Sequence, residues 1–572
     1  MAVSKITLLS TFLSISIFLY GQSPDEDQKI SISFSNEPLQ AALLRLDEAS
    51  DHRLSYNPRV LPSGVILNQS FESEAPETIL KEILGNTFEL KHIGNYIIIQ
   101  KANLTKKEKA TFQLKGGVKD AATGKELMDV SIYEVNSLQS TLSNEKGEFD
   151  LEAETHFEEA TFVISKRFYQ DTVVRVSQLR ALESPIVLKE EKITKGRKSI
   201  RERVNVLPSR LAKFFTSDKS RKNAQNVNFV DTRPFQFSLV PSIGTNRKLS
   251  SQVRNKVSLN LMAGYAYGVR GVEMGGLYNI DREEVRGIQV GGFGNTVGGE
   301  VHGLQAGGFI NTTRDYVYGA QIAGFINVAS DSVNGFQMGG FTNVTREIRG
   351  LQIAGFNNHT SNMAGFQLSG FINTTRLMDG FQLAGFMNVA KEVRGLQLSV
   401  VNIADSVASG MQFGLINISR KNGFISPALE SDDVIPYRLS FRSGINRFYS
   451  VLSAGIRGDD YWSYGVGFGS RLFLRNKTTF FINPEFRWFN LAEGRIREDE
   501  NNYLMRFNLN LGYQIFKRLS VTTGPSVNFY ATNQLDETGE PIIDIAGRPF
   551  LDRSSGNSRY QLWIGYTVGV GF

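Results

Sequence analysis

The chain has no cysteine among its 572 residues and only five histidines, His52, His92, His156, His302 and His359. The missing cysteine excludes disulfides, thiolate metal sites, a cysteine nucleophile and a lipid anchor on cysteine. The histidines show neither a metal-ligand spacing nor an HExxH helix, and the nucleophile-elbow and Walker signatures are absent. We therefore predict no enzymatic activity, no cofactor, and no catalytic, cofactor-binding or metal-binding residue.

Long apolar runs are missing after the first 21 residues. Lys5 precedes the mostly apolar stretch 6–20, small or polar residues follow at 21–23, and an acidic stretch begins at Asp25. This order is typical of a secretory signal peptide, which we place at residues 1–21. Because no later segment offers 18 unbroken apolar residues, any further membrane span would have to be a β-barrel.

The charge and the composition narrow the class of protein. A net charge of +6 is small for this length and gives no reason to expect a nucleic-acid partner. The 40 Phe, 19 Tyr and 54 Gly, against 3 Trp, favour strands and tight turns. Since the length exceeds that of one ordinary domain, we expect a mostly β protein of several domains.

Ten copies of one short phrase, which in its cleanest form reads Gly-x-Gln-x-(Ala/Gly)-Gly-Phe-x-Asn, lie within residues 271–418. Its copies are spaced by 16 residues four times and then by 15 residues five times. A period this short indicates a repeated β architecture. The opening glycines are Gly271, Gly287, Gly303, Gly319, Gly335, Gly350, Gly365, Gly380, Gly395 and Gly410.

Three positions of the phrase carry residues that we expect to form ladders, with a structural or an interaction role. They are glutamine at position 3, phenylalanine at position 7 and asparagine at position 9, and Glu273 replaces the glutamine in the first copy. The ladder residues of three central copies are Gln305, Gln321, Gln337, Phe309, Phe325, Phe341, Asn311, Asn327 and Asn343.

Two architectures fit these repeats. In a β-solenoid each repeat is one coil, and equivalent residues stack about 4.8 Å apart. In a membrane barrel of about 16 to 18 strands each repeat is one antiparallel strand, with Leu304 facing lipid and Gln305 facing the lumen. In a membrane barrel the connections between strands alternate between short and long. The linkers between the repeats do not alternate, since residues 389–394 resemble residues 344–349, three copies earlier. This regularity favours the solenoid, and the barrel stays open as the alternative.

The whole of residues 234–572 is expected to be an outer-membrane β region that contains the repeats, with barrel strands opening at 235–244 and 257–267. Near the end of the chain, residues 503–515 and 561–572 alternate between apolar side chains and small or polar ones, with Trp563 as the exception, as a membrane barrel strand requires. A soluble β-sandwich alternates for the same geometric reason. The final strand ends on Phe572 and resembles the terminal signal of bacterial outer-membrane proteins.

Residues 28–102 suggest a small mixed domain. Strands are expected at 30–34, 54–56, 65–67, 88–90 and 96–99, and helices at 38–46 and 75–84. This order resembles the short N-terminal domain of secretins and TonB-dependent receptors. The resemblance implies a periplasmic docking module that contacts a periplasmic or inner-membrane regulator.

Residues 111–188 suggest a second module. Gly117-Val118-Lys119-Asp120, Thr123-Gly124 and Ser143-Asn144-Glu145-Lys146-Gly147 place turns between short strands. The segment resembles the carboxypeptidase regulatory-like β-sandwich, of the immunoglobulin or transthyretin type. The resemblance implies a non-catalytic module of the kind that precedes the plug of large nutrient receptors.

The chain departs from those receptors after residue 188, because no segment of plug length precedes the barrel region. Residues 189–233 form a basic linker, in which Lys189 to Lys222 carry twelve Lys and Arg against four Asp and Glu. Such a stretch could lie on anionic lipid or a negatively charged partner, or could be a solvated helical linker.

We expect a non-enzymatic protein of the cell outer membrane, with its N-terminal domains in the periplasm. It would act in envelope signalling or scaffolding by protein–protein interaction. The alternatives are a passive porin-like channel, a transport component related to the TonB-dependent receptors, and a surface adhesin. The sequence leaves open which side of the membrane the repeats face.

Overall fold

The computed structural model describes residues 29–62, 64–85, 87–101, 109–157, 159–177, 180–182, 184–191, 210–458, 461–474, 479–493, 502–516 and 519–572. The expected signal peptide and residues 192–209 of the basic linker lie outside these ranges. The chain divides into two compact units, one of residues 1–193 with 227–229 and one of 194–226 with 230–572. Each unit is built mainly from strands.

The first half of unit 1 contains the helices and strands that the sequence predicts for residues 28–102, in the predicted order. Both helices and the two small sheets, β1-β3 and β2-β5-β4, share one apolar core, to which Leu43, Leu46, Ile79 and Ile97 contribute. The elements are β1 (Ile30–Pro38), α1 (Leu39–Ala49), β2 (Arg53–Ser55), the 3-10 turn η1 (Pro58–Val60), β3 (Ile66–Glu74), α2 (Pro76–Leu84), β4 (Phe88–Ile93) and β5 (Tyr96–Lys101).

The second half of unit 1 consists of two four-stranded sheets around one core. One sheet has the order β11-β10-β7-β8, and in the other β6 pairs with β12, β13 and β9. Leu114, Ile132 and Phe162, all fully buried, belong to the cluster between the sheets. The strands are β6 (Ala110–Asp120), β7 (Ser131–Glu134), β8 (Ser140–Leu142), β9 (Glu148–Thr155), β10 (Ala160–Ser165), β11 (Thr172–Val176), β12 (Arg180–Ala181) and β13 (Ile186–Leu188).

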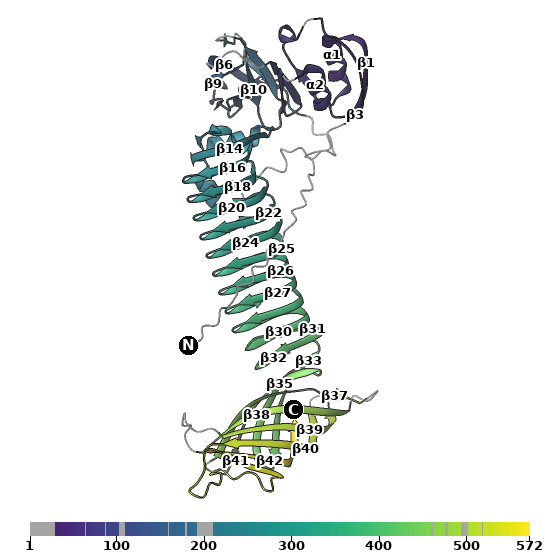
Figure 1. Ribbon diagram of the computed structural model, residues 1–572, viewed down its shortest axis with the longest axis vertical. Coiled ribbons are helices and arrows are strands. Elements are labelled where there is room, and N and C mark those ends of the chain that lie inside the picture. The colour runs from purple at the N-terminus through teal and green to yellow at the C-terminus, as the bar shows by residue number, and fades with distance from the viewer. Residues whose placement is uncertain are drawn as a thin grey trace, which may run out of the picture. The chain divides into compact units, whose positions relative to one another are not determined.

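The described part of unit 2 begins with two short helices and continues as a β-solenoid of about 11 turns. Figure 1 shows its turns as a column of strands that begins at β14 and ends at β32. Equivalent residues of successive repeats are parallel partners, as for Gly303 with Gly319 and Asn311 with Asn327. The prediction of a solenoid is confirmed. The alternative, in which the repeats are antiparallel barrel strands, is wrong.

The elements of this part follow the repeat closely. The helices are α4 (Arg210–Phe215), α5 (Asp218–Asn226) and the 3-10 segment η2 (Arg247–Gln252). The strands are β14 (Asp231–Val240), β15 (Ile243–Gly244), β16 (Val253–Asn260), β17 (Ala263–Ala266), β18 (Gly268–Gly275), β19 (Tyr278–Asp281), β20 (Val285–Gly291), β21 (Gly294–Val297), β22 (Val301–Gly307), β23 (Ile310–Thr313), β24 (Val317–Ala323), β25 (Ile326–Gly339), β26 (Thr342–Ala354), β27 (Asn357–Ser369), β28 (Ile372–Thr374), β29 (Leu377–Ala384), β30 (Met387–Leu398), β31 (Val401–Phe413) and β32 (Ile416–Ser419).

The opening glycine of each repeat is required by the stacking of the turns. All ten opening glycines have φ between 111° and 146°, a region that side chains other than glycine rarely adopt. A Cβ atom at Gly350 would also overlap the carbonyl oxygen of Gly335 in the turn before it. The glycine therefore lets consecutive backbones approach to parallel-sheet distance at a bend.

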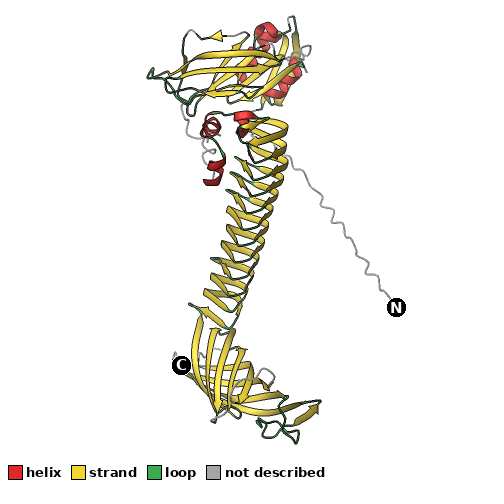
Figure 2. Ribbon diagram, turned by 90° about the vertical axis from the view of Figure 1, so that its left-hand side faces the viewer, coloured by secondary structure: helices red, strands yellow, loops and turns green. Residues whose placement is uncertain are grey.

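After the solenoid the chain forms a separate antiparallel sheet that closes on itself. Its ring order is β33-β34-β35-β36-β38-β39-β40-β42, and β33 pairs with β42 to complete a barrel. Figure 2 shows the barrel strands following the stacked turns of the solenoid. The strands are β33 (Gly423–Asp432), β34 (Tyr437–Ile445), β35 (Phe448–Arg457), β36 (Tyr461–Gly469), β37 (Leu472–Phe473), β38 (Phe480–Glu493), β39 (Asn502–Phe516), β40 (Leu519–Thr532), β41 (Leu551–Ser555) and β42 (Ser558–Gly571).

The predicted start of the barrel is wrong. Residues 235–244 and 257–267 were expected to be its first strands, but they belong to β14–β17 and to the solenoid sheet. β14 pairs in parallel with β16, and β16 pairs in parallel with β18 of the first repeat. Both kinds of strand alternate apolar and polar side chains, so the sequence pattern did not separate them.

The glycine geometry gives a direct prediction. Gly350→Ala forces a Cβ into the backbone of the neighbouring turn, so we expect a loss of stability of at least about 2 kcal/mol. Thermal unfolding of the full-length protein, followed by circular dichroism, measures it. Leu351→Ala, which shortens the next, half-buried side chain, should cost clearly less. An equal loss in the two variants would contradict the steric argument.

Candidate functional site

The predicted glutamine and asparagine residues line the interior of the solenoid in two unbroken ladders. Gln305, Gln321, Asn311 and Asn327 have no exposed surface. Each glutamine amide donates to the Oε1 of the glutamine one turn earlier, at 2.6 to 2.9 Å. Each asparagine amide donates to the Oδ1 of the asparagine one turn later, at 2.8 to 3.0 Å. The two ladders therefore run in opposite directions, and their dipoles oppose each other.

The direction of the glutamine ladder explains the departure in the first repeat. The side-chain N–H groups of the glutamines point toward the N-terminal end of the solenoid. The residue at position 3 of the first repeat must therefore accept a hydrogen bond, but it has no earlier glutamine to which it could donate one. Glu273 fills it: the Oε2 atom accepts from Gln289 Nε2 at 2.8 Å, and Oε1 accepts from Ser258 and Asn260. A carboxylate thus ends the row of aligned amide donors.

A second buried acid, Asp281, lies beside Glu273. The same Gln289 amide donates to Asp281 Oδ2 at 2.6 Å, and the other oxygen, Oδ1, is buried with no hydrogen-bond partner. Burial, together with the charge of the Glu273 carboxylate, raises the pKa of Asp281 well above its ordinary value. The N-terminal end of the solenoid interior therefore contains, beside Glu273, the carboxyl group of Asp281, which is costly to ionise.

In contrast to the buried amide ladders, the outer surface of the solenoid carries columns of exposed apolar side chains. At position 4, the column includes Met274, Val290, Ile322, Met338 and Leu383, each of which is 38% exposed or more. The predicted phenylalanine ladder at position 7 is also present. From Phe293 to Phe386 consecutive rings are 4.8 to 5.1 Å apart and within 18° of parallel.

The charged side chains lie elsewhere on the turns. Arg346 pairs with Asp331, Arg349 with Glu347 at 2.7 Å, and Arg394 with Glu392 at 2.6 Å. All six residues lie in the segments that connect position 9 of one repeat to position 1 of the next. The solenoid surface is therefore divided into an apolar part and a charged part.

The last turn of the solenoid is joined to the barrel by hydrogen bonds and by packing. The backbone N–H of Asn417 donates to Ser443 Oγ at 3.0 Å, and its Nδ2 donates to Ser450 Oγ at 3.2 Å. Ser450 Oγ in turn donates to the carbonyl oxygen of Leu415 at 2.9 Å. The asparagine ladder thus ends on serines of the barrel wall.

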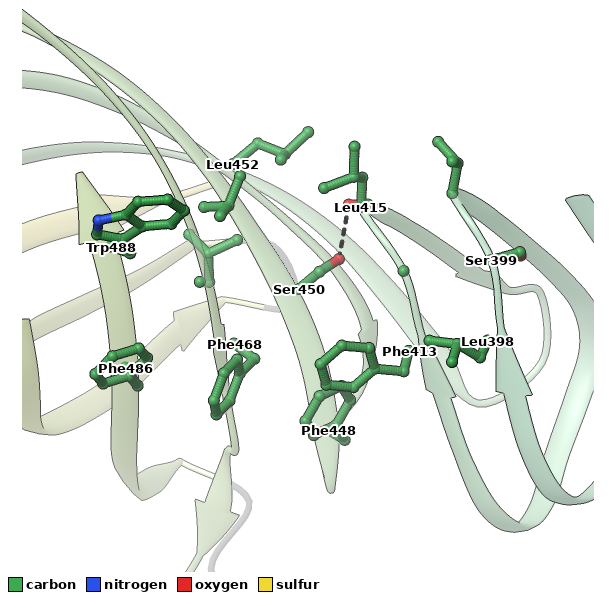
Figure 3. A pocket seen from close by; sticks show the side chains of 15 residues that line it. Leu398, Ser399, Phe413, Leu415, Phe448, Ser450, Leu452, Phe468, Phe486 and Trp488 are labelled. Carbon is green, nitrogen blue, oxygen red and sulfur yellow. Dashed lines mark hydrogen bonds between the residues drawn. The ribbon is translucent and has the colours of Figure 1, made fainter. Parts of the chain in front are cut away.

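An open apolar pocket of about 450 Å³ lies at this junction. Figure 3 shows the side chains of its wall, which come from the last solenoid turns and from three barrel strands. The lining residues are Leu398, Ser399, Val400, Phe413, Gly414, Leu415, Phe448, Ser450, Val451, Leu452, Val466, Gly467, Phe468, Phe486 and Trp488.

The barrel has apolar side chains on its outside and charged side chains in its interior, the opposite of a water-soluble domain. Leu429, Leu439, Leu511, Ile564 and Tyr566 are exposed on its outer surface, at 58% to 70%. Charged side chains fill the interior. The interior residues with ion pairs are Glu430, Asp432, Arg438, Arg442, Glu485, Arg487 and Arg506, and each of their side chains is at most 4% exposed.

This interior network is connected across the barrel. Glu430 pairs with Arg438 at 2.9 Å and with Arg487 at 2.5 Å, and it also pairs with Arg442. Arg442 reaches Glu485 on the other side at 2.7 Å. Trp563, the predicted exception on the polar face of the last strand, points into the barrel, and its indole N–H donates to Asp433 at 2.8 Å.

The predicted ladder residues thus divide into two groups. The glutamines and asparagines are buried and hold the turns together, whereas Phe309 and Phe341 are about 40% exposed and are available to a partner. Sequence reasoning missed the Glu273–Asp281 pair, the junction pocket and the interior ion network. The acid pair could have been found, because Glu273 is an exception to the glutamine of the repeat. The pocket could not, because its residues come from different strands and share no sequence pattern.

Comparisons with known proteins assign no family. No family model matches the chain, and neither any curated protein nor any solved structure matches it significantly. Among the residues that the structure describes, no helix is both long and apolar enough to cross a membrane. In the same residues, no group of three or more acidic or histidine side chains could hold a metal ion.

The acid pair predicts a pH-dependent stability. A carboxyl group whose pKa is raised by folding favours the folded state below its ordinary pKa of about 4, and this contribution is lost as the pH rises toward the folded value. Asp281→Asn removes the charge and should raise the thermal midpoint at pH 8, with a smaller gain at pH 4. The exposed Asp379→Asn serves as the control. An Asp281→Asn effect that is the same at both pH values would contradict this assignment.

Proposed function

We propose that this protein is a non-enzymatic outer-membrane protein in which the barrel is the anchor and the solenoid is a rigid rod. The N-terminal domains of unit 1 would act as periplasmic docking modules in envelope signalling or scaffolding. The observation that carries the proposal is the closed antiparallel barrel with an apolar outer surface and a charged interior.

The outer surface of the barrel supports a membrane location. Strands β38, β39, β40 and β42 have 14 or 15 residues, more than the 9 to 11 or so that a tilted strand needs to cross the hydrocarbon layer. A contiguous apolar surface on all sides of a barrel would be costly in water. In lipid the same surface is favourable, and the closed ring leaves no strand edge unpaired.

The interior of the barrel argues against the porin-like alternative. Eight strands give a barrel whose lumen is just wide enough for side chains to fill. Here the arginine and glutamate network occupies it. At one rim, Ile543 and Ile545 pack against Phe489, Leu504 and Tyr530. An anchor is therefore better supported than a channel.

The connections between barrel strands favour a periplasmic solenoid. The two-residue turn 446–447 lies at the rim where β33 begins and β42 ends, which is also where the solenoid is attached. The longer connection 533–550 follows the end of β40 and lies at the opposite rim. In bacterial outer-membrane barrels the short turns face the periplasm. The repeats would then face the periplasm, together with unit 1.

Because the chain has no cysteine, single substitutions can test this topology without removing native thiols. Lys391→Cys places a thiol on an exposed turn of the solenoid, and Glu537→Cys places one in the long connection after β40. We expect a membrane-impermeant maleimide to label Glu537→Cys on intact cells. It should label Lys391→Cys only after the outer membrane is permeabilised. Labelling of Lys391→Cys on intact cells would instead support a surface adhesin.

The docking role predicts a partner for residues 28–102. Leu44 on α1 carries a large apolar side chain that is 57% exposed in an otherwise well-packed domain. A photo-crosslinking amino acid at Leu44 of the full-length protein should capture a periplasmic or inner-membrane protein in cells. The same probe at Val187, which is 53% exposed in the neighbouring sandwich, is the control. Absence of any adduct from Leu44, and from the similarly exposed Ile66, would count against docking through this domain.

A further inference from the structure

The junction pocket between the solenoid and the barrel has the size of a ligand site. Its volume of about 450 Å³ falls within the roughly 300 to 1,000 Å³ of small-molecule pockets. It is formed by the last solenoid turns, through Phe413 and Leu415, and by β35, β36 and β38 of the barrel. The proposed anchoring role does not require such a hollow.

The chemistry of the wall disfavours polar ligands, because the indole N–H of Trp488 is its one side-chain polar group besides two serine hydroxyls. Only two of the lining side chains carry a hydroxyl group, and both hydroxyls bond within the protein. Ser399 Oγ contacts Val401 O at 2.8 Å and Asn402 Oδ1 at 2.7 Å. Ser450 Oγ donates to Leu415 O at 2.9 Å. A sugar, nucleotide or peptide would lose most of its hydrogen bonds to water here without replacement, whereas a hydrocarbon chain would lose none.

The pocket is continuous with the outer surface of the barrel. Phe413 of the solenoid lies 5.4 Å from Phe448 between ring centroids, Phe448 lies 5.8 Å from Phe468, and Phe468 lies 5.5 Å from Phe486. Figure 3 shows this row of rings, with Leu398 continuing it on the solenoid side. Leu398 and Phe413 are themselves the last two members of the position 4 column. One apolar surface therefore extends from the barrel wall onto the solenoid.

A cation lies close to the same place. Arg447 is exposed in the two-residue turn after β34 and directly precedes Phe448 of the pocket. An apolar pocket with a nearby cation at a membrane rim suits an amphipathic anion, because lipid phosphate groups attract arginine.

We propose that the junction pocket binds an acyl chain of a phospholipid from the membrane leaflet around this rim. The inference rests on the proposed membrane location of the barrel. The bound chain lies against Phe413, Phe448 and Phe468, between the two parts of unit 2. The position 4 column then offers the lipid an apolar surface that leads out of the bilayer along the solenoid.

The test uses the full-length protein reconstituted in vesicles of anionic phospholipid that carries a photoactivatable group near the end of one acyl chain. After illumination, mass spectrometry of peptides should place adducts at Phe413, Phe448 and Phe468. Their yield should exceed that around Ile564, an outer barrel residue that is 70% exposed and does not line the pocket. Equal adduct yields at the junction and around Ile564 would mean that the labelled lipid is ordinary boundary lipid, and they would overturn the proposal.

Matched variants separate a bound chain from boundary lipid. Val466→Trp and Leu415→Trp fill the pocket from the barrel side and from the solenoid side. Each should lower junction labelling roughly tenfold, since displacing about two methylene groups from an apolar site weakens binding by that factor. Ile564→Trp should leave junction labelling unchanged. Labelling that persists in both pocket variants would overturn the proposal.

The outcomes distinguish this inference from the proposed function. If the barrel inserts but the pocket is not a lipid site, Ile564 is labelled and the junction shows no excess. If the barrel does not insert, neither place is labelled and the protein floats free of the vesicles, so both proposals fail. Heat-dependent migration on gels shows that each variant has folded before it is compared.

Discussion

The close parallel stacking of successive backbone turns is the constraint on which the solenoid depends. Parallel strands about 4.8 Å apart place every side chain directly against its own equivalent in the next turn. Only residues that can pair with a copy of themselves are then tolerated in the interior. Amides do so by donating and accepting at once, and valine does so by packing, which is why Gln, Asn and Val form the inner columns.

Opposite directions of the two amide ladders have consequences at both ends. The glutamine ladder ends on a carboxylate, Glu273, because its donors point toward the N-terminal end. The asparagine ladder ends on Ser450 of the barrel, because its donors point the other way. Each row of donors therefore ends on an acceptor, whereas Gln412 Oε1, at the other end of the glutamine ladder, is buried without a hydrogen-bond partner. The solenoid and the barrel are joined by the same kind of interaction that holds the turns together.

Solenoid and barrel share an unusual distribution of polarity. Both bury rows of polar side chains inside, beside a valine column in the solenoid, and leave large apolar side chains outside, although one sheet is parallel and the other antiparallel. In the barrel this arrangement fits a lipid environment. On the solenoid it leaves a long apolar surface that leads directly to the barrel wall at Phe413 and Phe448. The proposed lipid site lies where the two surfaces meet.

The sequence alone determined the period, the ladder positions, the elements of the N-terminal domain and the alternation of the last strands, because these depend on neighbours along one chain segment. It favoured the solenoid through the regular linkers, but it misplaced the start of the barrel, since strands of both sheets alternate alike. Only the tertiary structure decided which strands pair. Three features join residues that are far apart in the chain: the ring closure from β33 to β42, the ion network around Glu430 and the pocket at Phe413 and Phe448. A local sequence pattern cannot predict such contacts.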